Sequence, residues 1–363
     1  MAANTTEKPH ASAVGRRDFV KMAVGTGVWS TALVTHTAQA QGQGRPNSID
    51  VHAHWEPPAY TKAVAALRGG SGGGEGNPLN ADLNERVKWM DEFGVQMNAL
   101  SLAAGPSGMA WEWAAPNEAA RLAQIFNDAS IEGHQAFPDR FLVGAVLPVG
   151  APTLALQELN RVAGRPGVRA VALPLSFGNR DFLFEPDFAP VLARIEELGY
   201  PILFHPLSPR TSNPRWEADG GLSNSVGFPT DGATTAAKFI TTGTLDKYPS
   251  LEIVLSHSGG AFPYVAGRIE HGFLRRDFKT ARPFREYIRR FHYDTLTYYP
   301  ETMRFLIDLV GTDRVVIGTD NFARMDTTSG VVDNPHTLVE AMNLPAADRE
   351  LIMRGNATRL FKL

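Results

Sequence analysis

"NSIDVHAHWEPPAY" (residues 47–60) begins as a short apolar run and ends in a proline-rich break. Side chains alternate between the two faces of a β-strand, so His52 and His54 project from the same face of this segment. Two imidazoles in one small volume are typical of a metal site, although such pairs also arise by chance. The rest of the chain decides between these two interpretations.

Further short runs rich in valine, isoleucine and leucine follow at 95–102, 141–149, 168–175, 201–207, 251–257, 291–296 and 314–320. Helix-like segments such as LNERVKWMDEFG and ETMRFLIDLVG lie between them, and several end in glycine, which often follows a helix. Eight strands that alternate with helices predict an α/β fold with a parallel sheet, and eight strands close a (β/α)8 TIM barrel. An open doubly wound sheet is the alternative, but no Gly-x-Gly-x-x-Gly follows the first strand, which argues against a dinucleotide-binding form.

Two connections, 56–82 and 208–232, are longer than most connections in compact domains and are predicted to be long loops after strands 1 and 5. Both follow strands, so both are expected at the C-terminal end of the barrel, where active sites are built. They act either as flexible lids over a site or as ordinary insertions.

Composition narrows the function classes. The 363 residues carry a net charge of −3 and are 43% hydrophobic, which suits one large barrel or two ordinary domains. The near-neutral charge gives no indication of nucleic-acid binding. The chain has no cysteine, so disulfides and thiolate ligands are excluded and any metal must be held by imidazole and carboxylate groups.

The first forty residues have the layout of an export signal. Arg16 and Arg17 precede a mildly apolar run that closes with Ala-Gln-Ala at Ala40. This run is too short and too interrupted for a membrane span. We therefore expect residues 1–40 to be a twin-arginine signal peptide that is removed, and 41–363 to form one periplasmic or secreted domain without a membrane anchor. A cytosolic protein with a flexible N-terminus is the alternative.

The ends of the predicted strands carry the most informative side chains. The first strand ends with His52 and His54, the fifth with His205, the sixth with His257 and the eighth with Asp320. A parallel barrel gathers these ends around one mouth. Three imidazoles and one carboxylate suit Zn²⁺ or a similar ion, with one position left for water or substrate. Packing or capping can explain each residue singly, but their shared position favours a metal site.

The segments DVHAHW, ILFHP, LSHSGGAFPYVAGRIE and VVIGTDNF resemble signature segments of the amidohydrolase superfamily. The branch is the amidohydrolase-related (family 2) group, which includes aminocarboxymuconate semialdehyde and γ-resorcylate decarboxylases. The resemblance implies one divalent metal, Zn²⁺ or alternatively Mn²⁺, held by His52, His54, His205 and Asp320, with His257 as an acid/base. Two-metal members often end the fourth strand with a carboxylated lysine, whereas this chain has VALPLSFG there, which favours one metal.

The resemblance also suggests substrate contacts. It implies that Arg268 binds a substrate carboxylate and, as in the decarboxylase branch, reaches the neighbouring subunit's site, so that a homodimer is functional. Asp294 is predicted near the mouth, where it contacts the substrate, orients a ligand or satisfies local backbone, and Arg324 either binds an anion or stays solvated. The aminocarboxymuconate enzyme's second substrate-binding arginine has no match in the glycine-rich segment before MDEFGV, and Arg86 lies inside the helix instead.

Two reactions fit these residues. The favoured one is non-oxidative decarboxylation of a small unsaturated or aromatic carboxylic acid, in which the metal chelates the carboxylate and an adjacent oxygen, and Asp320 or His257 protonates the carbon as carbon dioxide leaves. The alternative is hydrolysis of an amide, ester, lactone or C–C bond by metal-bound water, with His257 protonating the leaving group. The segment HSGGAFPYVAGR favours the first reaction, and the missing arginine weakens that preference.

Overall fold

The computed structural model describes residues 47–69, 78–102, 108–178, 180–207, 221–276, 280–321 and 331–363. The expected signal peptide lies outside these residues, as does Arg324, so both remain predictions. Within the described part of the chain, no helix has the length and apolar character needed to span a lipid bilayer.

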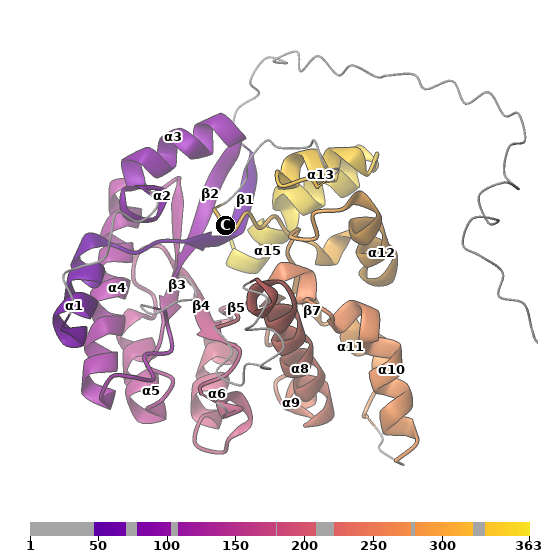
Figure 1. Ribbon diagram of the computed structural model, residues 1–363, viewed down its shortest axis with the longest axis horizontal. Helices are drawn as coiled ribbons and strands as arrows, with labels where there is room; N and C mark the ends of the chain where they lie inside the picture. Colours follow the sequence, from indigo (N-terminus) through magenta and orange to yellow (C-terminus); the bar gives the residue numbers. More distant parts are fainter. Residues whose placement is uncertain are drawn as a thin grey trace, which may run out of the picture. The chain divides into compact units, whose positions relative to one another are not determined.

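Seven parallel strands form one sheet whose spatial order follows the sequence (Figure 1). The strands are β1 (Ser48–His54), β2 (Val95–Ser101), β3 (Phe141–Val146), β4 (Val168–Pro174), β5 (Ile202–His205), β6 (Ile253–Leu255) and β7 (Phe291–Tyr293). Each strand is hydrogen-bonded to the next one. The predicted parallel sheet is therefore confirmed, and an order without reversal is that of a barrel rather than of a doubly wound sheet.

The eighth strand position is filled by residues 315–317. Isolated parallel bridges pair Tyr293 of β7 with Val315, and Asp50 of β1 with Ile317. These pairings join the two edge strands of the sheet through isolated bridges, without a regular strand over residues 315–317. The curled sheet thus closes on itself at its most weakly paired position.

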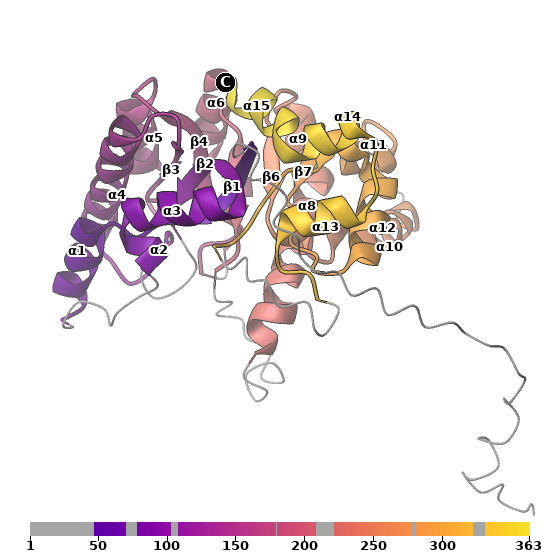
Figure 2. The same ribbon diagram turned by 90° about the horizontal axis from the view of Figure 1, so that it is seen from above.

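Helices cover the outside of the sheet (Figure 2). They are α1 (Pro58–Arg68), α2 (Pro78–Ala81), α3 (Leu83–Phe93), α4 (Pro116–Ala136), α5 (Pro152–Val162), α6 (Ala189–Leu198), α8 (Phe228–Thr241), α9 (Thr244–Lys247), α10 (Phe262–Leu274), α11 (Phe284–Ile288), α12 (Pro300–Val310), α13 (Pro335–Ala341), α14 (Ala346–Glu350) and α15 (Asn356–Phe361). Local signals set several of their ends. The Asp82 side chain accepts the amide of Asn84 at 2.8 Å where α3 begins, and Gly94, with φ of 74°, ends it.

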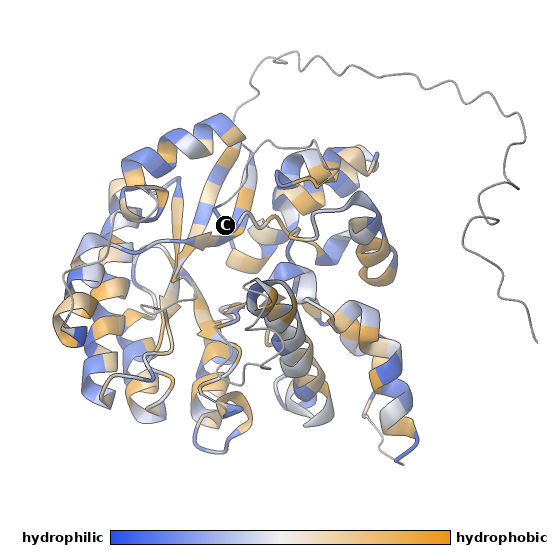
Figure 3. Cartoon of the chain, viewed as in Figure 1, coloured by the Kyte–Doolittle hydropathy of each residue, from blue (hydrophilic) through white to orange (hydrophobic). Residues whose placement is uncertain are grey.

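The helices combine hydrophilic and hydrophobic residues along their length (Figure 3). In α5, for example, the buried Ala155 and Leu159 belong to the same apolar cluster as Val171 and Leu173 of β4. A separate apolar cluster takes residues from nearly every strand position, namely Ile49, Val51, Ala99, Leu142, Ala170, Leu203, Val254 and Val316. Leu360 and Phe361 of α15 belong to the same cluster. The middle of the barrel is therefore a packed core, as in other barrels of this kind, and leaves the strand ends for chemistry.

The connection after β1 departs from the predicted long loop over 56–82. Much of it is helix α1, which begins with a proline, is rich in alanine and ends at Gly69, where φ is 70°. Tyr60 and Val64 bury one face of this helix. The loop prediction gave the glycine-rich stretch too much weight, and residues 70–77 of that stretch lie outside the described residues.

The connection after β5 also differs from the prediction of a loop over 208–232. A π-helical turn at Ser223–Gly227 leads directly into α8, which begins at Phe228. Residues 208–220 lie outside the described residues. Only this undescribed part remains open to the loop interpretation.

Ile317 tests the closure of the barrel. Its side chain is fully buried where the last strand segment pairs with β1. Because Ile317→Ala leaves a cavity at this pairing, we expect it to lower the free energy of unfolding by about 2–5 kcal/mol, measured by urea denaturation. Leu67→Ala, at a side chain that is 41% exposed, should change it by less than about 0.5 kcal/mol. Equal stability of the two variants would contradict the closure.

Candidate metal centre and active site

Four side chains meet at the C-terminal end of the barrel. His52 and His54 lie at the end of β1, His205 ends β5, and Asp320 follows the segment in the eighth strand position. Each residue offers one possible ligand atom, and these atoms all lie within 4.8 Å of one another. The structure therefore brings together the four residues that the sequence analysis selected as metal ligands.

The distances within this group suit a shared cation. The Nε2 atoms of His52 and His54 are 3.2 Å apart, and Nε2 of His54 lies 2.9 Å from Oδ1 of Asp320. The ring centroids of His54 and His205 are 4.5 Å apart, and all three imidazoles are buried. Two buried nitrogens that face each other need a proton or a cation between them. The donor set of three imidazoles and one carboxylate fits a divalent ion such as Zn²⁺ or Mn²⁺.

Hydrogen bonds on the far side of two rings select their tautomers. Nδ1 of His52 lies 2.7 Å from Oδ2 of Asp294, and Nδ1 of His205 lies 2.7 Å from the carbonyl oxygen of Pro206. Both partners only accept hydrogen bonds, so Nδ1 carries the proton and Nε2 is left free to bind a metal. Nδ1 of His54 is buried without a partner among the described residues.

Asp294 lies behind the site rather than at the position of a substrate contact. It is fully buried, and its carboxylate accepts the amides of His257 at 3.0 Å and Ser258 at 2.6 Å in addition to His52. The amide of Leu296 is a fourth donor, 3.2 Å from Oδ1. Because each oxygen then accepts two hydrogen bonds, neither is free for a substrate. The substrate contact predicted for Asp294 is therefore replaced by the other role considered for it, the orientation of a ligand.

The turn after β6 positions His257. Its φ of 51° and that of Ser258, 56°, lie in the left-handed region, which is sparsely populated by residues other than glycine and recurs at functional sites. Gly260 follows with φ of 58°, and a Cβ there would lie 2.3 Å from the carbonyl oxygen of Pro229. Gly259, with φ of 76°, is confined in the same way, because a Cβ there would lie 2.7 Å from the ring of Tyr293. These two close approaches explain the paired glycines of the segment SHSGG.

His257 lies directly beside the metal-ligand group. Its Nε2 lies 3.8 Å from Oδ2 of Asp320, and its ring stacks on Phe228 with the centroids 6.2 Å apart. The ring centroid of His52 is 5.2 Å away. His257 is thus close enough to exchange a proton with Asp320 through small movements or one water molecule.

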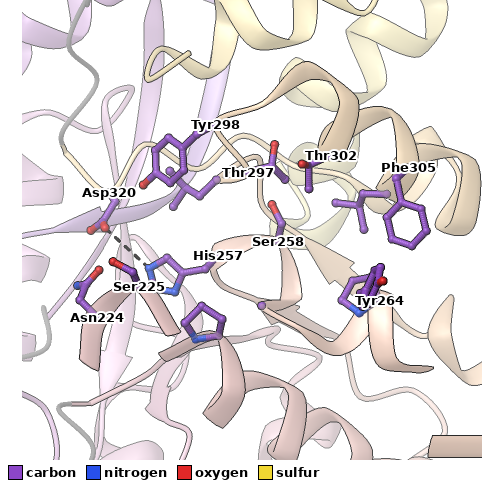
Figure 4. A pocket seen from close by; sticks show the side chains of 15 residues that line it. Asn224, Ser225, His257, Ser258, Tyr264, Thr297, Tyr298, Thr302, Phe305 and Asp320 are labelled. Carbon is purple, nitrogen blue, oxygen red and sulfur yellow. Dashed lines mark ion pairs between the residues drawn. The ribbon is translucent and has the colours of Figure 1, made fainter. Parts of the chain in front are cut away.

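A cavity of about 440 Å³ opens beside His257 and Asp320 (Figure 4). Its hydroxyl-bearing lining residues are Ser225, Ser258, Tyr264, Thr297, Tyr298 and Thr302. Phe305 and Tyr264 lie at the end opposite Asp320 (Figure 4), and Leu296 and Leu306 contribute further apolar surface. A cavity of this size, largely apolar but with hydroxyl groups along its length, suits a small ring compound.

Burial and neighbouring charges set the protonation of the group before a metal binds. Burial lowers the pKa of His54 and of His205, so both are neutral at neutral pH. Burial alone raises the pKa of Asp320, but the adjacent imidazoles outweigh it and hold this pKa well below the usual range. Burial lowers the pKa of His52, but the carboxylates of Asp320 and Asp294 outweigh it and raise this pKa to about 9.

The structure describes one of the two predicted substrate-binding arginines, and that one, Arg268, does not line this cavity. Arg268 lies on α10 with an exposed side chain. Its predicted contact with a substrate needs a second copy of the chain and remains a prediction. Arg324 lies outside the described residues.

Two buried charged residues near the site were missed. Asp50 accepts the amide of His52 at 3.0 Å and the hydroxyl of Thr319 at 2.7 Å, and so ties β1 to the segment before Asp320. Strict alternation in β1 would put Asp50 on the histidine face, but the register of β1 against β2 shifts between Asp50 and Ala53. Asp50 instead accepts a hydrogen bond from Asn98, which lies next to Arg86 of α3. Arg86 lies on the buried face of α3, where the helical periodicity alone does not separate packing from function.

The pKa of His52 gives a testable pH dependence. In the metal-free protein the imidazole of His52 is doubly protonated below about pH 9, and a metal must displace the second proton. His54, His205 and Asp320 need to lose no proton near neutral pH. Binding of Mn²⁺ should release about one proton, and its affinity should rise about tenfold per pH unit between roughly pH 7 and 8.5. Calorimetry in two buffers of different ionisation enthalpy measures both; a pH-independent affinity would contradict this assignment.

Comparisons with known proteins agree with the geometry. A family model described as Amidohydrolase matches residues 49–363. The γ-resorcylate decarboxylase of Rhizobium sp. (strain MTP-10005) is 32% identical over 295 residues, which cover 77% of this chain and 86% of that protein. The 2-amino-3-carboxymuconate-6-semialdehyde decarboxylase of Dictyostelium discoideum is 30% identical over 250 residues, or 66% of each chain.

A solved structure shows the same architecture. It is a dihydroxybenzoic acid decarboxylase from Polaromonas sp. JS666 with bound manganese and the inhibitor 2-nitroresorcinol. It is 26% identical, with a TM-score of 0.73, over 87% of this chain and 97% of that one. The family match over most of the chain, the two relatives and the shared fold lead to one conclusion: this chain belongs to the amidohydrolase family.

Proposed function

We propose that the protein is a metal-dependent carboxy-lyase that removes carbon dioxide, without oxidation, from a small aromatic or unsaturated carboxylic acid. The observation that carries the proposal is the pair of His257 and Asp320, which lies between a three-histidine cluster and a largely apolar cavity. The named activities of the Rhizobium and Dictyostelium relatives, both decarboxylases, support it.

We propose that one divalent ion is held by His52, His54, His205 and Asp320. Such an ion supplies positive charge that stabilises negative charge on the oxygen atoms of a bound substrate. The donor set suits Zn²⁺, and the manganese in the Polaromonas enzyme makes Mn²⁺ an equal candidate. Elemental analysis of the purified protein should find about one equivalent of divalent ion per chain.

The residues of this chain handle the proton. When the bond between the ring carbon and the carboxylate breaks, its electron pair stays on the carbon and carbon dioxide leaves. One proton from the His257 and Asp320 pair takes the vacated position, and solvent later returns a proton to the pair. The buried apolar side chains of the lining, Leu296 and Leu306, contact the ring of the substrate beside this pair.

We also propose that the protein acts outside the cytoplasm. The twin arginines Arg16 and Arg17 and the apolar run that follows them support export. N-terminal sequencing of the protein recovered from the periplasm, with a new end after Ala40, would agree with this proposal, and an intact chain found only in the cytoplasm would contradict it.

A substrate screen separates decarboxylation from the hydrolytic alternative. The metal-loaded protein is incubated with ortho-hydroxybenzoates and unsaturated carboxylic acids in one set, and with lactones and amides in another. We expect carbon dioxide from the first set and no turnover in the second. Release of acid from lactones or amides without gas would show that the protein is a hydrolase.

His257→Asn tests the proton-handling pair. The variant should keep its metal, because His257 is not among the four clustered ligands, and should lose about 10²–10⁴ in kcat, the usual scale of general acid–base help. Gas release and metal content are measured on the same samples. His271→Asn, an exposed histidine on α10, is the matched control and should behave like the unaltered protein. Unchanged turnover in His257→Asn would remove His257 from the reaction.

A further inference from the structure

Arg86 is fully buried in α3 and uses every N–H group of its guanidinium. Nε donates to the carbonyl oxygen of Leu79 at 2.7 Å, and Nη2 donates to the carbonyl oxygens of Leu79 and His54. Nη1 donates to Oδ1 of Asn321 at 2.6 Å and reaches Oδ1 of Asn98 at 3.5 Å. A guanidinium has five donors in a planar fork, and no other side chain can fill these positions together.

Asn321 completes the link to the metal-ligand group. Its Nδ2 donates to the carbonyl oxygen of His54 at 2.6 Å and to Oδ1 of Asn80 at 2.8 Å. The carbonyl of His54 therefore accepts from both Arg86 and Asn321. Asn321 directly follows Asp320. The hydrogen bonds among Arg86, Asn321 and the carbonyl of His54 therefore hold the backbone at both His54 and Asp320.

The backbone at Asp320 needs such support. Asp320 has φ of 52° and Asn321 has φ of 57°, so two consecutive residues with side chains lie in the left-handed region. This conformation is costly for residues other than glycine and persists only where the surroundings impose it. Here the side chain of Asn321 is held on both sides, because it accepts from Arg86 and donates to Asn80 and to the carbonyl of His54.

The burial of a charged guanidinium also indicates that Arg86 has a role beyond packing. Burial lowers the pKa of its guanidinium to about 10, against the attraction of Asp50, so the group stays charged at neutral pH. No ion pair joins Arg86 to a carboxylate within the ranges that the structure describes. Packing alone would favour an apolar side chain at such a position.

We propose that Arg86 is a positioning residue of the metal centre. Its guanidinium fixes the carbonyl of His54 and the side chain of Asn321, and thereby holds the imidazole of His54 and the carboxylate of Asp320 at the spacing that one divalent ion requires. The inference rests on the ligand set of the proposed function and adds a residue that touches neither metal nor substrate.

Arg86→Lys and Asn321→Ala test this role. Lysine keeps the charge of Arg86 but offers three donors instead of five, and alanine removes the intermediate side chain. We expect each variant of the full chain to bind Mn²⁺ about 10- to 100-fold more weakly, the usual effect of losing a group that orients a ligand. Competition with a chelator measures the affinity, and the visible spectrum of the Co²⁺-loaded protein should change in intensity because the ligand geometry changes.

Glu158→Gln provides the control for stability alone. Glu158 is equally buried, bonds to Asn127 at 2.7 Å and to Arg161, and lies between α4 and α5. This variant should lower the thermal midpoint without changing the Mn²⁺ affinity or the Co²⁺ spectrum.

Two results would overturn the inference. One is a Mn²⁺ affinity of Arg86→Lys or Asn321→Ala equal to that of the unaltered protein. The other is a loss of Mn²⁺ affinity that is proportional to the fall in thermal midpoint in all three variants, Glu158→Gln included. If Arg86→Lys does not fold, Asn321→Ala decides alone. Metal binding is measured without substrate, so a protein that binds Mn²⁺ but releases no carbon dioxide would refute the proposed function and leave the role of Arg86 intact.

Discussion

The carboxylate of Asp294 is the constraint on which the site depends. One of its oxygens receives Nδ1 of His52 at 2.7 Å and the amide of His257 at 3.0 Å, and the other receives the amide of Ser258. The same buried group thus selects the tautomer of a clustered histidine and holds the left-handed turn that carries the acid/base. A neutral side chain would weaken both, because charge-assisted bonds are about twice as strong as neutral ones.

Much of the fold and of the cluster could be predicted because both follow from periodicity. Alternation in β1 puts His52 and His54 on one face, and parallel strands of a barrel bring His205 and Asp320 to the same mouth. The role of Asp294 could not be read in this way. The end of a strand predicts that Asp294 lies near the mouth of the barrel. Which donors reach its carboxylate depends on the turn at His257, which is distant in sequence.

Helix α1 and Arg86 were missed for related reasons. The glycine-rich stretch that follows α1 hid an eleven-residue helix, since a single short helical pattern beside a glycine cluster is easily taken for a loop. Arg86 shares the buried face of α3 with Trp89 and Met90. Its five donors find their acceptors on four separate segments of the chain, at His54, Leu79, Asn98 and Asn321, and no local pattern reports such contacts. In both cases tertiary contacts outweighed the local signal.

The closure of the barrel at residues 315–317 links its folding to the binding of a metal ion. Residues 315–317 join the first and last strands by isolated bridges, and Asp320, just beyond this closure, faces His52 and His54 across it. A cation bound by these side chains would link the first and last strands of the barrel where they are joined only by isolated backbone bridges. Such an ion would contribute to the stability of the folded barrel as well as to the reaction, because an ion that binds only the folded state stabilises it.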